Sequence, residues 1–230
     1  MRWPRLPRPA RSSGDDPALD RARMVAEQLE ARGIRDPELL RAFATVERHR
    51  FVDGDEPYGD HALPVGSGQT ISQPYVVAMM TAAARPSQGW REANVLEVGT
   101  GSGYQAAVLA ELGADVTTIE RHEALATTAR QGLQEAGYGD RVKVVVGDGT
   151  QGWPEGAPYR SILVTAGGPS VPGPLLEQLD RSGGRLVMPV GDREHQFLTL
   201  VVRDGDTLRT RELEPVVFVP LIGKHGHPVE

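Results

Sequence analysis

Short apolar runs alternate with helical segments through the middle of this 230-residue chain, and this alternation constrains its fold most strongly. The runs are rich in Val, Ile and Leu and are short, so they predict strands. Because helical segments separate them, the pattern is typical of an α/β fold, a parallel sheet that helices cover on both faces. The predicted strands are residues 94–98, 116–119, 142–146, 161–165 and 184–190, and the helices between them are residues 106–112, 123–135 and 175–179.

The N-terminal part of the chain is predicted to be helical. Apolar residues recur at helical spacing over residues 17–32, and a second helix is expected to begin at Pro37 with Asp36 as its N-cap. A loop rich in Gly, Pro and Asp follows at residues 53–68, and a third helix is expected to begin at Pro74. These helices precede the predicted sheet.

The C-terminal part is rich in β-forming residues. Residues 197–203 and 207–219 read as two strands, and the Asp204–Gly205 turn between them predicts an antiparallel hairpin. We therefore expect a mostly parallel sheet with an antiparallel pair at one edge.

The composition argues against several classes of function. A net charge of −6 argues against non-specific nucleic-acid binding, which needs a basic surface. The absence of cysteine excludes disulfides and a thiol nucleophile, and it is compatible with a reducing cytosol. The chain has no run of about 18 apolar residues, so the sequence predicts no membrane span. The six histidines lack the spacing of a metal site. We expect a cytoplasmic protein without a metal ion; the oligomeric state does not follow from the sequence, and a monomer is the working expectation.

A glycine cluster follows the first predicted strand and opens a predicted helix. It reads Glu97-Val98-Gly99-Thr100-Gly101-Ser102-Gly103-Tyr104. Glycines there allow a sharp turn and the close approach of a ligand. The Gly-x-Gly-x-Gly spacing is shorter than that of a dinucleotide site, and an acidic residue lies two positions before the first glycine. This pattern favours a cofactor with an amino-acid moiety, whose ammonium group a carboxylate or carbonyl near Glu97 can face.

Two further turns are candidates for binding the same cofactor. Glu120 ends the second strand, where a carboxylate can accept both hydroxyls of a ribose. Asp148 and Gly149 follow the third strand and could recognise an adenine amino group with the backbone close to the ring. The alternatives are a solvated Glu120 and a plain turn at Asp148. All three turns lie at the carboxyl ends of neighbouring strands, where open α/β sheets bind ligands, and this favours the cofactor site.

Residues 63–74 closely resemble the signature segment of the protein-L-isoaspartate O-methyltransferase family. They read Leu-Pro-Val-Gly-Ser-Gly-Gln-Thr-Ile-Ser-Gln-Pro, and family members carry Gly-Gln-Thr-Ile-Ser-Gln-Pro or Ala-Thr-Ile-Ser-Ala-Pro before the helix that precedes the glycine loop. The resemblance covers nearly everything after residue 17. It continues through residues 95–104, 147–152, 157–159, 162–166, 183–191, 195–196 and 218–221.

This resemblance implies a Rossmann-like class I methyltransferase fold and S-adenosyl-L-methionine as cofactor, with S-adenosyl-L-homocysteine as its product. It implies isoaspartyl-containing proteins and peptides as substrates, Ser72 as the active-site residue, and a substrate-facing loop that includes Thr70, Ile71 and Gln73. The family's cofactor-binding positions correspond to Glu97, Gly99, Glu120, Asp148 and Gly149, and we add Thr100 and Gly101 from the glycine loop.

Composition and the extent of the resemblance together suggest how the chain is divided. Residues 1–16, where Arg and Pro alternate, are expected to be a disordered extension, with an interaction tail as the alternative. Residues 17–230 are expected to form one methyltransferase domain. It would comprise a helical substrate-side region at residues 17–90, a cofactor-binding core at residues 91–191 and a β-rich segment at residues 192–230.

The expected reaction needs no general base. Its acceptor is a carboxylate with a pKa of about 4, which is already ionised at neutral pH. Ser72 is therefore interpreted as a hydrogen-bonding residue that orients the substrate; its hydroxyl could also cap the helix at Pro74. The family implies that the ester then closes without the enzyme to a succinimide, which water opens partly to normal aspartate.

Two alternatives to protein repair remain open. The chain could be dedicated to one aspartate of a biosynthetic peptide, or it could be a non-catalytic cofactor-binding module. The intact glycine loop and residues 69–74 argue against the second of these. Two departures from the family pattern are Arg160, where an acidic residue is usual, and Gly167-Gly168 in place of a more alanine-rich segment.

Overall fold

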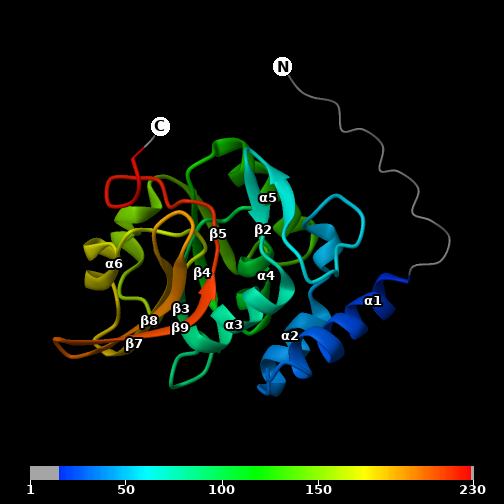
Figure 1. Ribbon diagram of the computed structural model, residues 1–230, viewed down its shortest axis with the longest axis horizontal. Coiled ribbons are helices and arrows are strands. Elements are labelled where there is room, and N and C mark those ends of the chain that lie inside the picture. Colours follow the sequence, from blue (N-terminus) through cyan, green and yellow to red (C-terminus); the bar gives the residue numbers. More distant parts are fainter. Residues whose placement is uncertain (1–15, 229–230) are drawn as a thin grey trace.

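A computed structural model describes residues 16–228, so most of the predicted N-terminal extension lies outside the described residues. Its main feature is a seven-stranded sheet in the order β5-β4-β3-β6-β7-β8-β9 (Figure 1). The first five strands in this order are parallel, as predicted. The chain runs outward through β3, β4 and β5 and returns to place β6 on the other side of β3. The parallel strands are β3 (Asn94–Val98), β4 (Asp115–Glu120), β5 (Val142–Val146), β6 (Ser161–Val164) and β7 (Ser182–Gly191).

The C-terminal strands β8 (Gln196–Asp204) and β9 (Thr207–Val216) form the predicted antiparallel pair. β8 also pairs with β7 in the antiparallel sense, so the hairpin extends the main sheet. β9 ends three residues earlier than predicted. The reason is that the Phe218 N–H donates to the side-chain carbonyl of Gln196 (2.9 Å) instead of continuing the strand ladder.

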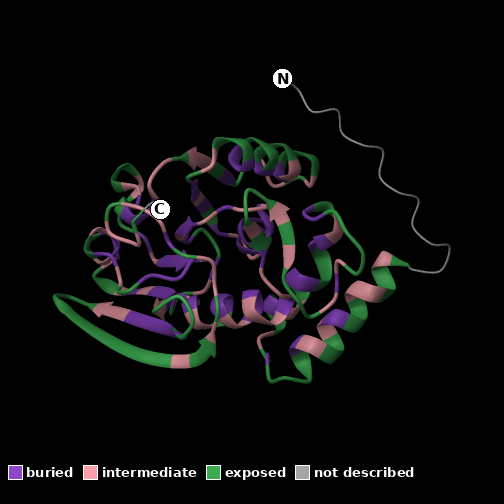
Figure 2. Cartoon of the chain, turned by 45° about the horizontal axis from the view of Figure 1, so that its top comes forward, coloured by how far each residue is buried: buried purple, intermediate pink, exposed green. Residues whose placement is uncertain are grey.

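Two apolar layers enclose the sheet, because successive residues of each strand point to opposite faces. On β3, Val95 packs with the N-terminal helices and with α4 (Tyr104–Glu111), whereas Leu96 packs on the opposite side with Leu175 of α6 (Gly173–Glu177). The central strands β3 and β6 are almost wholly buried, whereas β9 is exposed along most of its length (Figure 2). The 13-residue helix α5 (Glu123–Glu135) packs on β4 and β5 and matches its predicted bounds.

The first two N-terminal helices lie at the opposite side of the molecule from β8 and β9 (Figure 1). The first predicted helix is present as α1 (Pro17–Arg23), which continues as a π-helical segment, η1 (Met24–Glu30). Asp36 caps α2 (Pro37–Thr45) as predicted, with its carboxylate accepting from the Glu38 N–H at 2.9 Å. The third helix, α3 (Pro74–Ala84), packs on β6 and β7. Short 3₁₀ turns complete the described chain: η2 (Arg48–Arg50), η3 (Gly149–Gln151) and η4 (Pro154–Gly156).

The prediction of an uninterrupted loop over residues 53–68 was wrong at its end. Strand β1 (Leu63–Gly66) pairs with β2 (Gln69–Ile71) in a small separate hairpin. Ser67 and Gly68, the two residues of its turn, both have positive φ angles (51° and 70°), which is typical of the tight turns that join two strands. Strands of four and three residues are too short to show the period-two pattern on which the prediction depended.

Candidate active site

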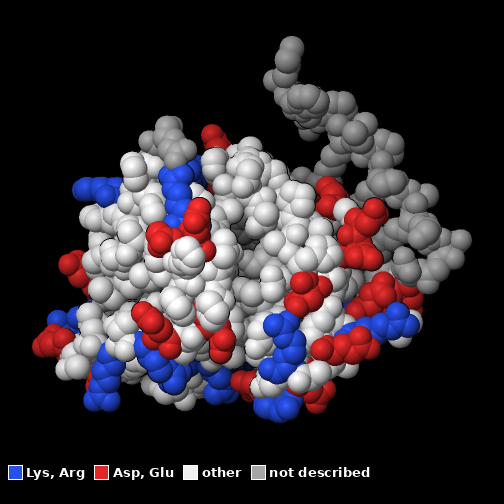
Figure 3. Space-filling view, viewed as in Figure 1, with Lys and Arg blue, Asp and Glu red and all other residues white. Residues whose placement is uncertain are grey.

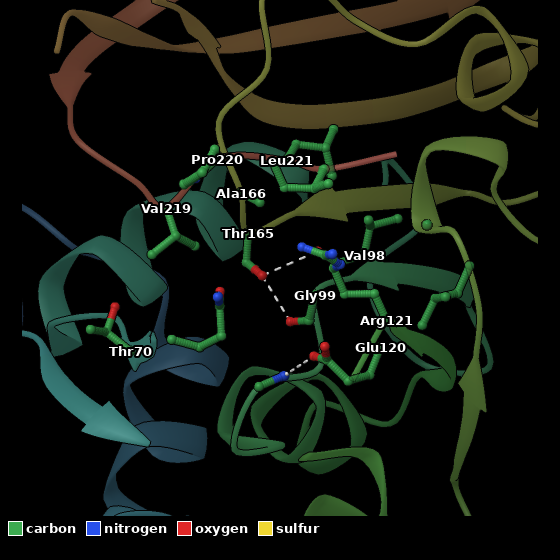
Figure 4. A pocket seen from close by; sticks show the side chains of 15 residues that line it. Thr70, Val98, Gly99, Glu120, Arg121, Thr165, Ala166, Val219, Pro220 and Leu221 are labelled. Atoms are coloured by element: carbon green, nitrogen blue, oxygen red, sulfur yellow. Dashed lines mark hydrogen bonds between the residues drawn. The ribbon is translucent and has the colours of Figure 1, made fainter. Parts of the chain in front are cut away.

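A pocket of about 550 Å³, counting its open mouth, lies at the carboxyl ends of the parallel strands (Figure 4). It is located where β3 lies between β4 and β6, at the point where the strand order reverses, and open α/β sheets bind ligands there. The small β1–β2 hairpin and the C-terminal segment contribute to its walls. The lining residues are Gln69, Thr70, Val98, Gly99, Gly101, Ile119, Glu120, Arg121, Gly149, Thr165, Ala166, Val219, Pro220, Leu221 and Ile222.

The glycine loop forms the floor of the pocket between β3 and α4. Gly99 has a φ angle of +96°, and a Cβ on this residue would collide with the Thr165 hydroxyl. That hydroxyl donates toward the carbonyls of Val98 (3.1 Å) and Gly99 (2.8 Å) and so holds the loop against the end of β6 (Figure 4). Gly101 has a φ angle of +52°, and an added Cβ would meet nothing within 4 Å. The loop is thus tightly packed at its first glycine and open at its second.

Glu120 projects from the end of β4 and lines the pocket, although only 4% of its surface is exposed. One carboxylate oxygen accepts the N–H of Gly101 (3.0 Å) and the other accepts the N–H of His122 (2.9 Å). A carboxylate has lone pairs for further donors after two such bonds. Glu120 is therefore held in one orientation and can still accept hydroxyl groups of a ligand.

Glu97 directly precedes the lining residue Val98 on β3; it does not line the pocket itself and is completely buried. Neither of its carboxylate oxygens has a hydrogen-bond partner among the described residues. Burial raises the pKa of Glu97 to about 8; the nearby Thr118 hydroxyl opposes this effect and the charge of Glu120 adds to it. The Thr118 hydroxyl itself hydrogen-bonds to that of Thr100 (2.7 Å), which is also buried. A buried acid without partners is costly unless something else compensates it.

Asp148 and Gly149 lie at the end of β5, but only Gly149 lines the pocket. One oxygen of Asp148 accepts the N–H (3.0 Å) and the hydroxyl (2.7 Å) of Thr150. The other accepts the N–H of Lys224 (2.8 Å) and, at 3.4 Å, the side chain of Gln151. Desolvation raises the pKa of Asp148, but these hydrogen bonds, first that from Lys224, hold it below its usual range. Recognition of an adenine amino group by this carboxylate would require it to give up or share one of these bonds.

The four residues expected to face the substrate differ in burial and in whether they line the pocket. Thr70 is exposed and lines the pocket, whereas Ile71 is buried in the core. Ser72 and Gln73 are half-buried and connect β2 to α3. The possibility that the Ser72 hydroxyl caps α3 was wrong, because Gln73 occupies the N-cap position and no side chain caps this helix. The Ser72 hydroxyl is therefore not required for the helix end.

The comparison with known families is decisive at this point. The family model described as protein-L-isoaspartate(D-aspartate) O-methyltransferase matches residues 20–226. The chain belongs to this family. Among curated relatives, the protein-L-isoaspartate O-methyltransferase of Methanoregula boonei is 51% identical over 210 residues, which cover 90% of this chain and 94% of the relative. Protein-L-isoaspartate O-methyltransferase 2 of Pelobacter propionicus is 54% identical over 208 residues, which cover 88% and 90% of the two chains.

Solved structures confirm the predicted Rossmann-like methyltransferase fold. One structure of a protein-L-isoaspartate O-methyltransferase superimposes with a TM-score of 0.78 and 26% identity, and the match covers 90% of this chain and 67% of that one. A structure from Plasmodium falciparum in complex with S-adenosyl-L-homocysteine has a TM-score of 0.73 and 22% identity, with coverage of 86% and 96%. The family resemblance seen in residues 63–74 is therefore confirmed.

Sequence reasoning missed part of the pocket of this isoaspartate methyltransferase family member. Thr165 follows β6 at the same sheet edge as Gly99, and that position was a signal for it. Residues 219–222 form a wall of the pocket (Figure 4), and the family resemblance over residues 218–221 was the available signal for them. Gln196 holds this wall from behind: its carbonyl accepts the N–H of Phe218 (2.9 Å) and its amide donates to the Phe218 carbonyl (3.3 Å).

The described residues contain neither a candidate metal site nor a candidate membrane span. Within residues 16–228, no group of three or more histidine or acidic side chains is arranged to hold a metal ion. Over the same residues, no helix combines the length and the apolar character needed to cross a membrane.

Proposed function

We propose that this protein transfers a methyl group from S-adenosyl-L-methionine to the free carboxylate of L-isoaspartyl residues in proteins and peptides. One observation carries the proposal. Gln69 and Thr70, from the segment that resembles the isoaspartate methyltransferase signature, line the same pocket as Gly99, Glu120 and Gly149 from the strand ends. The segment expected to contact the substrate and the turns expected to bind the cofactor thus border a single cavity.

The donors and acceptors at the pocket suit an adenosyl cofactor. Glu120 offers a fixed carboxylate for the ribose hydroxyls, and Gly101 leaves open space beside it. Glu97 is a buried acid without a partner, which fits the ammonium of a methionine moiety. When bound, S-adenosyl-L-methionine would supply a methyl group on a positively charged sulfur.

The residues of the chain then have to place the acceptor oxygen. We propose that Ser72 and Thr70 hydrogen-bond to the substrate and orient its carboxylate toward the methyl group, with Ile71 and Gln73 shaping the same loop. The acceptor is ionised at neutral pH, so the site needs orientation and exclusion of water rather than a base. Precise positioning of two reacting groups can lower a barrier by about 7–11 kcal/mol. The resulting ester would close to a succinimide without further help from the enzyme.

The proposal also covers the oligomeric state, location and partners of the enzyme. We propose that residues 17–230 act as one methyltransferase domain and that the protein is a monomer. We also propose that it works in the cytoplasm, and the lack of cysteine is compatible with that reducing compartment. Nucleic acid is not proposed as a partner, given the net charge of −6. On the face shown in Figure 3, acidic and basic side chains are mixed and lie mainly toward the margins, without a continuous basic patch.

The test is methyl transfer from labelled S-adenosyl-L-methionine to two peptides that differ only in carrying isoaspartate or normal aspartate. We expect labelling of the isoaspartyl peptide and little labelling of the other. The label should be lost slowly at neutral pH as the ester closes to a succinimide. Equal labelling of both peptides, or of neither, would refute the proposed substrate.

A further inference from the structure

Arg48 is a fully buried arginine that the proposed chemistry does not use. It is the first residue of the 3₁₀ turn η2, and its exposed fraction is 0%. No carboxylate pairs with it among residues 16–228; Asp60, whose charge acts on it only weakly, is bonded to Arg32 at 2.5 Å. Burial lowers the pKa of Arg48 to about 10, so the side chain remains charged at neutral pH. A buried charge without an opposite charge is costly, and an apolar side chain of similar size usually stabilises a fold at least as well.

The hydrogen bonds of Arg48 lead to the loop that carries Ser72. Its Nη2 donates to the Ser72 carbonyl at 2.7 Å, and its Nε donates to the Pro57 carbonyl at 2.8 Å. Ser72 lies between the end of β2 and the start of α3, outside both elements. The bond from Arg48 therefore fixes the peptide group that follows Ser72. It adds to the hydrogen bonds by which the next carbonyl, that of Gln73, accepts the N–H groups of Val76 (3.1 Å) and Val77 (3.2 Å) at the start of α3.

The guanidinium group also contacts the helix that follows the glycine loop. Arg48 lies over the ring of Tyr104, with its central carbon 4.9 Å from the ring centroid. Tyr104 is the first residue of α4, directly after Gly103, and its ring is held edge-on by Phe43 and Phe51. A planar cation over an aromatic ring is a favourable and directional contact. One side chain thus links Ser72 to the start of the helix behind the glycine loop.

We infer that Arg48 is a positioning residue for methyl transfer: it holds the Ser72 backbone in a fixed relation to the cofactor-binding loop. This inference rests on the proposed function, because it concerns the placement of the substrate. Nη1 of Arg48 is buried and has no hydrogen-bond partner among the described residues, so the bonds to Pro57 and Ser72 and the contact with Tyr104 are what orient the guanidinium group. The fork geometry matters because Nε and Nη2, two separate nitrogens of one planar group, make the bonds to Pro57 and Ser72, whereas lysine offers a single nitrogen.

The test compares Arg48→Met and Arg48→Lys with the wild-type protein. Methionine fills the space without the charge, and lysine keeps the charge without the fork. We expect Arg48→Met to fold and to bind S-adenosyl-L-homocysteine within about twofold of wild type by titration calorimetry, while kcat/KM for the isoaspartyl peptide falls about tenfold or more, as for a lost charge-assisted hydrogen bond. The kcat/KM of Arg48→Lys should lie between those of Arg48→Met and the wild-type protein.

Arg203→Met is the matched control. Arg203 also donates to carbonyls only, but these lie in and just after α6 and in the β8–β9 turn, outside the pocket lining, and we expect its loss to leave peptide kinetics unchanged. Its acceptors are the carbonyls of Leu176 (2.9 Å), Glu177 (3.0 Å), Leu179 (3.2 Å) and Gly205 (3.2 Å).

Every outcome bears on the inference. Wild-type kcat/KM in Arg48→Met, or equal losses of peptide turnover and cofactor affinity, would overturn it. If Arg48→Met does not fold, Arg48→Lys decides, and full turnover in that variant would overturn the inference. Failure of both variants to fold would make Arg48 a stability residue. If the wild-type protein itself fails to methylate the isoaspartyl peptide, the proposed function has failed instead.

Discussion

Glu97→Gln should change how the stability of the free protein depends on pH. The carboxyl group has a folded-state pKa of about 8 against an ordinary value of 4.5, because burial raises it, the Thr118 hydroxyl only partly opposes this, and the charge of Glu120 adds to it. The folded protein therefore keeps a proton that the unfolded chain has lost between these two pH values. Its stabilising contribution is complete below pH 4.5 and is lost as the pH rises through 8. Glutamine has the same shape and does not titrate, so it removes this dependence.

The size of the effect follows from the two pKa values. Each tenfold change in proton concentration within the window changes the free energy of unfolding by about 1.4 kcal/mol, and the wild type should lose about 2 kcal/mol from this group between pH 6 and pH 8. Urea unfolding of both proteins at pH 6, 7 and 8 measures this. The difference between variant and wild type should grow by that amount, while contributions from other groups cancel. If the difference in free energy of unfolding between variant and wild type does not change with pH, Glu97 is already ionised in the free protein.

The same residue predicts a proton released on cofactor binding. If the ammonium of the cofactor pairs with Glu97, the carboxyl group should ionise on binding and release about 0.9 proton at pH 7, given its pKa of about 8. Calorimetric titration with S-adenosyl-L-homocysteine in phosphate and in Tris, whose ionisation enthalpies differ, reports this number directly. Glu97→Gln should bind without proton release. Equal heats for the wild type in both buffers would refute the pairing.

Three further variants test the site. Ser72→Ala should retain S-adenosyl-L-homocysteine affinity and lose about tenfold or more in turnover; a loss of affinity instead would mean that Ser72 belongs to the cofactor site. Glu120→Ala should weaken that affinity by about tenfold to a hundredfold in calorimetry, because it removes the pocket carboxylate that Gly101 holds; unchanged affinity would exclude the ribose contact. Gly99→Ala should destabilise the protein by more than the about 1–3 kcal/mol expected from positive φ alone, since its Cβ meets Thr165. Gly33→Ala is the control, with a φ angle of +97° and open space around it, and equal losses in urea unfolding would contradict the collision.

The sheet could be predicted closely because its strands carry local patterns. β3, β5 and α5 match their predicted bounds, since each is an apolar or periodic segment with turn residues on both sides. The positions of Gly99, Glu120 and Gly149 around one pocket follow from the same pattern, because the carboxyl ends of neighbouring parallel strands meet. Local sequence patterns are sufficient here, because residues that follow parallel strands lie together at one edge of the sheet.

The closing contacts of the site could not be predicted, because each joins residues far apart in the chain. Asp148 accepts the N–H of Lys224, 76 residues later, and this bond directs its carboxylate toward the C-terminal segment. Arg48 follows Glu47 in a polar stretch that looks solvent-exposed, yet the fold surrounds it with Pro57, Ser72 and Tyr104. Burial of such groups depends on the assembled tertiary structure and not on periodicity. These are also the groups whose hydrogen bonds fix one loop relative to another, so the catalytic geometry depends most on contacts that local patterns do not encode.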